Sequence, residues 1–202
     1  MQITAALPPL TAADITNPAT QRFNPANGHI YEFVNTVVSW ETAKTLAEQS
    51  NLNGIQGYLV NITSAAEQSF VRTNAATLIT VGYDSATIWL GATDTTSEGT
   101  WTWVTGPEAG TTFWQGAGPL GTYGVAGVAV NSQYSNWRGG RYDAPNLTAG
   151  DGELANADYG SMLINDLGGS GASGGWEDDV NSYTAHGTSR PGGNAYVIEY
   201  SR

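Results

Sequence analysis

Eight carboxylates and no lysine or arginine lie between Asp143 and Asp179 of this 202-residue chain. The eight are Asp143, Asp151, Glu153, Asp158, Asp166, Glu177, Asp178 and Asp179. Like charges held close together in an ordered segment repel each other unless a cation lies among them. Neighbouring glycine, asparagine and threonine residues suit a loop that surrounds an ion with oxygen atoms. Because hard oxygen ligands in flexible geometry are typical of calcium sites, the segment predicts Ca²⁺ binding.

The composition is that of a folded, acidic domain. Apolar residues make up 40% of the chain, which is enough for one domain with its own core. The formal net charge of −11 argues against binding to nucleic acid or to anionic membranes. The chain has no cysteine, which excludes a disulfide scaffold, a cysteine-ligated zinc finger and a thiol nucleophile.

We expect neither a membrane-spanning segment nor a signal peptide in this sequence. No apolar run reaches the roughly 20 residues of a membrane helix, so we expect no membrane insertion. The start lacks the basic and apolar regions of a signal peptide. We therefore expect a monomeric module from a larger multidomain protein, with residues 1–27 as a linker or entry strand and residues 28–202 as the ligand-binding domain.

Two helices are predicted from their starts and their apolar spacing. The first follows Ser39 and carries Trp40, Ala43 and Ala47 on one face. Ser64 and Glu67 form a capping-box pattern in which each side chain satisfies the other's backbone amide. The second helix follows this pattern, and its predicted apolar face consists of Ala66, Phe70, Val71, Ala75 and Leu78.

Strands are predicted where β-branched and aromatic residues alternate or form short apolar runs, at 29–35, 57–62, 87–93, 101–104, 159–164 and 195–200. The tryptophans at 89, 101 and 103 are expected in the core. Residues 106–158 are rich in glycine and also contain asparagine, tyrosine and proline along their length. An irregular stretch of that length in a compact domain is usually functional.

The order of six short motifs resembles that of a C-type lectin-like domain over roughly residues 28–200. The motifs are Ile88-Trp89-Leu90-Gly91, Trp101-Thr102-Trp103 before Gly106, Ser135-Asn136-Trp137, Ala144-Pro145-Asn146, Asn156-Ala157-Asp158-Tyr159 and Trp176-Glu177-Asp178. The resemblance implies an α+β fold with two short helices packed on small antiparallel sheets and a long calcium-binding loop region. The lack of cysteine resembles the bacterial type found in large surface adhesins.

The same resemblance implies calcium ligands, in one of two registrations. In the first, Ca²⁺ lies near Asn146, Asp158, Glu177 and Asp178. Ala144 departs from the family's glutamate or glutamine at that position, and Asp143 could replace it from one position earlier. In the second registration, Glu153 and Asn156 supply the ligands instead. Both registrations stay open at the level of sequence.

Other residues of this region are candidates for contact with a ligand. Arg138 and Arg141 are the basic residues closest to the acidic segment, and either hold the loop by a salt bridge or clamp a ligand carboxylate. Aromatic rings in the region offer apolar contact with a sugar ring or side chain. The full set of predicted ligand-binding residues is Trp137, Arg138, Arg141, Tyr142, Asp179 and Tyr183.

We expect a calcium-dependent extracellular adhesion module, located on a cell surface. Its partner would be a glycan, or a peptide or protein end, that completes the shell of an open Ca²⁺ position. The alternatives are a domain that binds protein C-termini without sugar activity and a calcium-stabilised spacer. We do not expect an enzyme, because Glu177 and Asp178 are adjacent and adjacent carboxylates rarely flank a scissile bond.

Overall fold

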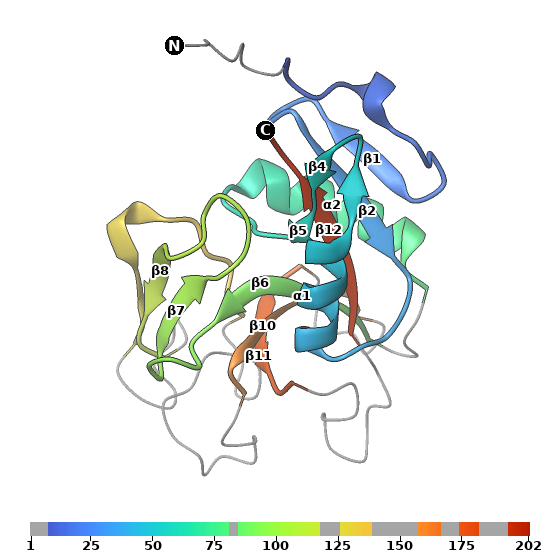
Figure 1. Cartoon of the computed structure of the whole chain (residues 1–202). Helices are drawn as coiled ribbons and strands as arrows, with labels where there is room; N and C mark the ends of the chain where they lie inside the picture. The colour runs from blue at the N-terminus through green and yellow to red at the C-terminus, as the bar shows by residue number, and fades with distance from the viewer. Residues whose placement is uncertain (1–7, 81–84, 118–125, 139–156, 167–173, 182–193) are drawn as a thin grey trace, which may run out of the picture.

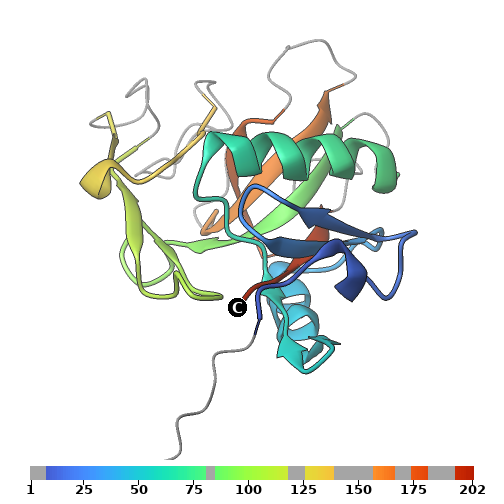
Figure 2. The ribbon, with the colours of Figure 1, turned by 90° about the horizontal axis from the view of Figure 1, so that it is seen from above.

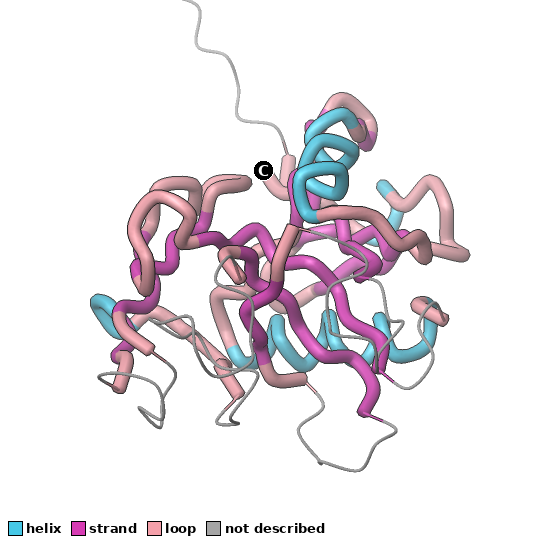
Figure 3. Tube along the Cα trace, turned by 90° about the horizontal axis from the view of Figure 1, so that it is seen from below, coloured by secondary structure: helices cyan, strands magenta, loops and turns pink. Residues whose placement is uncertain are grey.

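The computed structural model describes residues 8–80, 85–117, 126–138, 157–166, 174–181 and 194–202. Its two main helices are α1 (Trp40–Gln49) and α2 (Ala65–Leu78). Each begins where the sequence predicts, because the Ser39 side chain accepts from the Thr42 amide and the Ser64 side chain accepts from the Glu67 amide. The helices lie on opposite sides of the central strands (Figures 1 and 3). The predicted α+β class with two helices is confirmed.

Most strands join in one sheet whose order is β1-β2-β12-β6-β7-β8-β9, with β10 beside β6 and β11, and β5 beside β12. The strand bounds are β1 (Gln21–Asn24), β2 (His29–Val34), β5 (Tyr58–Leu59), β6 (Ser85–Thr93), β7 (Thr100–Trp103), β8 (Thr112–Gln115), β9 (Val128–Ala129), β10 (Tyr159–Asp166), β11 (Trp176–Asp179) and β12 (Asn194–Tyr200). A separate hairpin consists of β3 (Asn51–Leu52) and β4 (Ile55–Gln56). The pairing of β12 with β6 is parallel, which joins the antiparallel parts into one mixed sheet.

The sheet separates two apolar clusters, one under each helix. Side chains alternate along β12, so that Val197 packs in the cluster under α2 while Ile198 packs in the cluster under α1. Val71 and Ala75 are the fully buried apolar residues of α2. Figure 2 shows α2 lying across β10 and β6. Because both sides of the central strands are covered, every residue of β12 is buried rather than every second one, and most of them are apolar.

The core contains the tryptophans that the sequence placed there. Trp89, Trp101 and Trp103 are fully buried. The indole nitrogen of Trp89 donates to the Val38 carbonyl oxygen at 2.8 Å, which satisfies a polar atom inside the fold. The α1 face of Trp40, Ala43 and Ala47 is also buried as predicted.

The buried face of α2 differs from the prediction. Ala66 is exposed, whereas Glu67 and Gln68 are buried. The Glu67 carboxylate accepts from the amide and hydroxyl of Thr63, at 2.8 and 3.0 Å, instead of completing the capping box with Ser64. A helical pattern of apolar residues cannot anticipate these two side chains, because Glu67 also accepts from Tyr31 of β2 and Gln68 accepts from Trp176 of β11.

The described ends of the chain lie together, as the resemblance implies. Strand β2 pairs with β12, and the Arg202 guanidinium donates to the carbonyl oxygen of Pro8. Leu10 is buried and β1 pairs with β2, so residues 8–27 pack on the domain. Two single-turn 3₁₀ helices occur at Ala12–Asp14 and Val130–Ser132. Among the described residues, no helix is long and apolar enough to cross a membrane.

Candidate functional site

Antiparallel pairing of β10 with β11 brings part of the acidic segment together. Tyr159 is opposite Asp179, and Gly160 is opposite Asp178. Asp158 directly precedes Tyr159, so it lies at the same end of the strand pair as the two aspartates of β11. Twenty residues of sequence separate Asp158 from Asp178, and only the strand register places them at one edge of the fold.

The end of β6 adds two carboxylates that the sequence analysis missed. The Asp94 amide donates to the carbonyl oxygen of Asp158 at 3.3 Å, and the Thr93 hydroxyl donates to the same oxygen at 2.6 Å. Asp94 is only 3% exposed. Its Oδ2 accepts from the Gly99 amide at 2.8 Å, while its Oδ1 has no hydrogen-bond partner among the described residues. A buried carboxylate oxygen without a partner is costly, and a cation would satisfy it.

The charges around Asp94 are negative. Burial, joined by the charges of Glu98 and Asp158, raises the pKa of Asp94 to about 7 against the opposing hydrogen bond from the Gly99 amide. The pKa of Glu98 is also raised, by burial and then by Asp158. Burial likewise raises the pKa of Asp158. Glu98 and Asp158 both disfavour the charged form of Asp94, so a hard divalent cation such as Ca²⁺ near the end of β6 would relieve this repulsion.

The positions of Asp94 and Glu98 in the sequence are themselves evidence for a site, although neither residue belongs to the six motifs. Asp94 and Glu98 are four residues apart and follow directly on the buried 87–93 strand. Acidic residues at the end of a buried strand, just before a glycine turn, are candidates for a site at the sheet edge. Their link to Asp158 could not be found in this way, because it depends on the pairing of β6 with β10.

The predicted ligands Glu177 and Arg138 lie against each other. They form an ion pair between side chains that are 2% and 9% exposed, respectively. The Arg138 amide also donates to the Trp176 carbonyl oxygen at 3.0 Å, which fixes residue 138 beside β11. The arginine therefore makes the salt bridge that was one of its two predicted roles. Calcium ligation by Glu177 and ligand clamping by Arg138 stay predictions.

The two aspartates of β11 are buried at the junction with β12. Asp179 Oδ2 accepts from the Asn194 side chain at 2.8 Å, and Asp179 Oδ1 accepts from the Val180 amide at 2.9 Å. Asp179 therefore anchors the start of β12. Asp178 is buried opposite Gly160 of β10.

Trp137 belongs to an aromatic cluster in the core. Its ring centroid lies 4.7 Å from that of Trp101, 6.2 Å from Phe113 and 5.8 Å from Trp176. The residue is 8% exposed. These contacts give Trp137 a structural role behind the site, and its contact with a ligand stays a prediction.

The remaining predicted site residues lie outside the described part of the chain. They are the metal-ligand candidates Asp143, Asn146, Glu153 and Asn156, and the ligand-binding candidates Arg141, Tyr142 and Tyr183. The described residues therefore do not distinguish between the two loop registrations.

Comparison with known proteins agrees with this architecture. The sequence model of the C-type lectin domain family matches residues 36–156. Over 115 residues the chain is 41% identical to halomucin of Haloquadratum walsbyi, a match that covers 57% of this chain and 1% of that protein. The chain thus spans a very small part of this curated relative's length.

Solved structures show the same fold at low sequence identity. The C-type lectin CEL-I from Cucumaria echinata superposes with a TM-score of 0.56 at 20% identity, covering 92% of this chain and 98% of that one. Human lithostathine superposes with a TM-score of 0.57 at 17% identity, covering 98% and 99% of the two chains. From the family match over more than half of its length, together with this fold, the chain belongs to the C-type lectin domain family.

Proposed function

We propose that the chain is a calcium-dependent, extracellular module that binds a carbohydrate ligand and serves adhesion. The observation that carries the calcium part is the buried Asp94 carboxylate, whose Oδ1 lacks a partner among the described residues and which faces the charges of Glu98 and Asp158. Bound Ca²⁺ would supply positive charge and open coordination positions for ligand oxygens. The carboxylates of Asp94, Glu98 and Asp158 would hold it at the end of β6.

Carbohydrate is the ligand class that the family supports best. The matching family model is that of the lectin C-type domain, and CEL-I is described as a C-type lectin. A sugar with two neighbouring hydroxyl groups can complete the shell of a cation that the protein only partly surrounds. The same family membership supports binding rather than catalysis, so we do not propose an enzymatic reaction.

Similarity to halomucin supports a surface-exposed or secreted protein. We propose that this chain is a monomeric module of a larger protein, with its partner a glycan on another cell surface. The described ends lie together, which suits a domain inserted in a multidomain chain.

A thermal melt tests the calcium part directly. The protein is unfolded in excess EDTA and again in millimolar CaCl₂, and we expect the melting temperature to rise by several degrees because Ca²⁺ binds only the folded form. Asp158→Asn should reduce this rise. Glu48→Gln is the matched control, because Glu48 is a partly exposed carboxylate of α1 that pairs with Lys44. An equal calcium response in wild type and Asp158→Asn would contradict the placement of the ion.

Competition then separates the ligand classes. A sugar panel and peptides with free or amidated C-termini are added to the calcium-loaded protein, and a further rise with a sugar supports our proposal. A rise only with peptides that have a free C-terminus would replace it with the peptide-binding alternative. Calcium stabilisation with no response to either class would support the spacer.

A further inference from the structure

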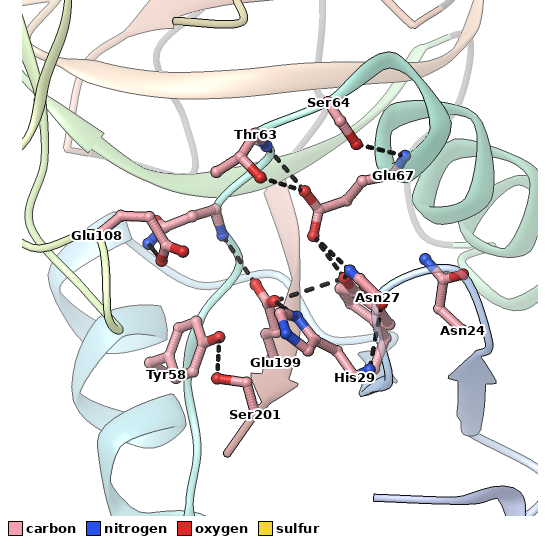
Figure 4. A network of polar contacts seen from close by, with 12 residues as sticks. Asn24, Asn27, His29, Tyr58, Thr63, Ser64, Glu67, Glu108, Glu199 and Ser201 are labelled. Atoms are coloured by element: carbon pink, nitrogen blue, oxygen red, sulfur yellow. Dashed lines mark hydrogen bonds and ion pairs between the residues drawn. The ribbon is translucent and has the colours of Figure 1, made fainter. Parts of the chain in front are cut away.

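A second cluster of metal-ligand side chains lies where β2, α2 and β12 meet (Figure 4). It consists of His29, the first residue of β2, Glu67 of α2 and Glu199 of β12. One ring nitrogen and one oxygen from each carboxylate all lie within 4.8 Å of one another. Within the described ranges, this is the one group of three such side chains that converges so closely. Each member comes from a different element, so the cluster exists only in the folded protein.

The cluster contains two carboxylates that can be negatively charged and one imidazole that can be positively charged. Glu67 and Glu199 are both buried, whereas the His29 side chain is 22% exposed and leaves a route from solvent. Burial raises the pKa of Glu199 to about 7, and Glu67 adds to this rise against the hydrogen bond from His29. Burial opposes protonation of His29, but the hydrogen bond and charge of Glu199 outweigh it, so the His29 pKa is raised. A single proton on the imidazole does not fully balance the charge of two desolvated carboxylates.

Hydrogen bonds from the nearby segment of Asn61 and Thr63 hold each carboxylate in one orientation. Glu67 Oε2 accepts from the amide and hydroxyl of Thr63, and Glu199 Oε2 accepts from the Asn61 amide at 3.2 Å. Both Oε1 atoms are thereby turned inward. Glu199 Oε1 lies 2.5 Å from His29 Nδ1, and Glu67 Oε1 accepts from the Tyr31 hydroxyl at 2.5 Å. Outer hydrogen bonds that fix ligand carboxylates in this way are the usual support of a metal site.

We propose that His29, Glu67 and Glu199 form a zinc site that ties α2 to strands β2 and β12. Imidazole nitrogen and carboxylate oxygen are both ligand atoms that Zn²⁺ takes in proteins, whereas Ca²⁺ requires six to eight oxygen ligands. Water completes a four-coordinate shell, while the Tyr31 hydroxyl donates to the two carboxylates from outside that shell. The ion replaces the protons shared within the cluster and neutralises its two buried carboxylates.

This zinc site is separate from the calcium site proposed above. Glu199 follows Asn194 by five residues of β12, about 16 Å at the usual rise of a strand, and it is Asn194 that contacts Asp179. The two sites therefore lie toward opposite ends of β12. Failure of one proposal leaves the other intact.

Zinc titration of the metal-free protein tests the proposal. Protein stripped with a chelator is exchanged into millimolar CaCl₂, ZnCl₂ is added, and bound zinc is measured by mass spectrometry and by competition with a zinc-binding dye. We expect one zinc per chain and a rise in melting temperature. His29→Gln should weaken zinc binding by at least about tenfold, while the calcium response of the same variant persists and shows that it folds.

His186→Gln is the matched control, since the chain has two histidines and His186 is the other one. Zinc binding should be unchanged in this variant. Equal zinc affinity in wild type and His29→Gln, or no zinc bound at one per chain, would overturn the site. A calcium-induced rise in melting temperature that disappears in His29→Gln would overturn the choice of zinc.

Discussion

The backbone amide of Asp94 donates a hydrogen bond to the carbonyl oxygen of Asp158 at 3.3 Å. This bond joins the residue after β6 to the residue before β10 and brings two acidic side chains to one edge of the sheet. The backbone contact is favourable, whereas the carboxylates raise each other's energy when charged. A fold that holds acids together in this way gains stability when a cation binds.

Asp94→Asn should therefore have opposite effects with and without calcium. In EDTA the variant removes a buried charge that faces Glu98 and Asp158, and we expect its melting temperature to rise by a few degrees. In CaCl₂ it lacks a carboxylate ligand, so calcium should bind at least about tenfold more weakly. Calorimetry and thermal melts in both buffers measure the two effects, and a loss of stability in EDTA would contradict this account.

Arg138→Met should destabilise the domain strongly. The guanidinium pairs with Glu177 in a nearly dry environment, and removing one partner of a buried pair costs about 3 kcal/mol because a charge stays behind. Urea unfolding measures the change. The double variant Arg138→Met/Glu177→Gln should recover part of the loss, and a double variant no more stable than Arg138→Met would show that the pair is not coupled.

Gln68 holds β11 to α2, and its replacement should be costly. Its Oε1 accepts from the Trp176 indole nitrogen at 2.8 Å, and its Nε2 donates to the Gly174 carbonyl oxygen at 2.5 Å. Gln68→Met keeps the volume but removes these partners from a buried indole and a backbone carbonyl, which should cost about 2 kcal/mol. Gln49→Met, at the exposed end of α1, is the control and should be near neutral in the same unfolding experiment.

Gly91→Ala should disturb the sheet, since a Cβ at this position would meet the side chains of Thr105 and Asn61 and lie 2.8 Å from the Leu59 carbonyl oxygen. Overpacking of this kind costs about 1–3 kcal/mol or more. Chemical denaturation checks the loss of stability. A variant as stable as wild type would show that the Ile88-Trp89-Leu90-Gly91 motif has no packing requirement for glycine.

Local sequence determines the helices and most of the core. Ser39 and Ser64 cap their helices through bonds to residues three positions away, and the α1 face repeats at helical spacing. Such signals need only neighbouring residues, so they can be predicted without the fold. The ordered motifs likewise indicate the family, which the domain match confirms.

Tertiary structure alone decides which polar side chains meet. Asp94 reaches Asp158 through the pairing of β6 with β10, and His29 reaches Glu199 through the pairing of β2 with β12. Glu67 looked like half of a capping box, yet its carboxylate is turned toward Tyr31 and Thr63. Helix packing brings Glu67 to Tyr31 over 36 positions, and strand pairing brings His29 to Glu199 over 170 positions. Because no local pattern encodes that register, the sequence predicts the elements while the folded sheet determines the sites.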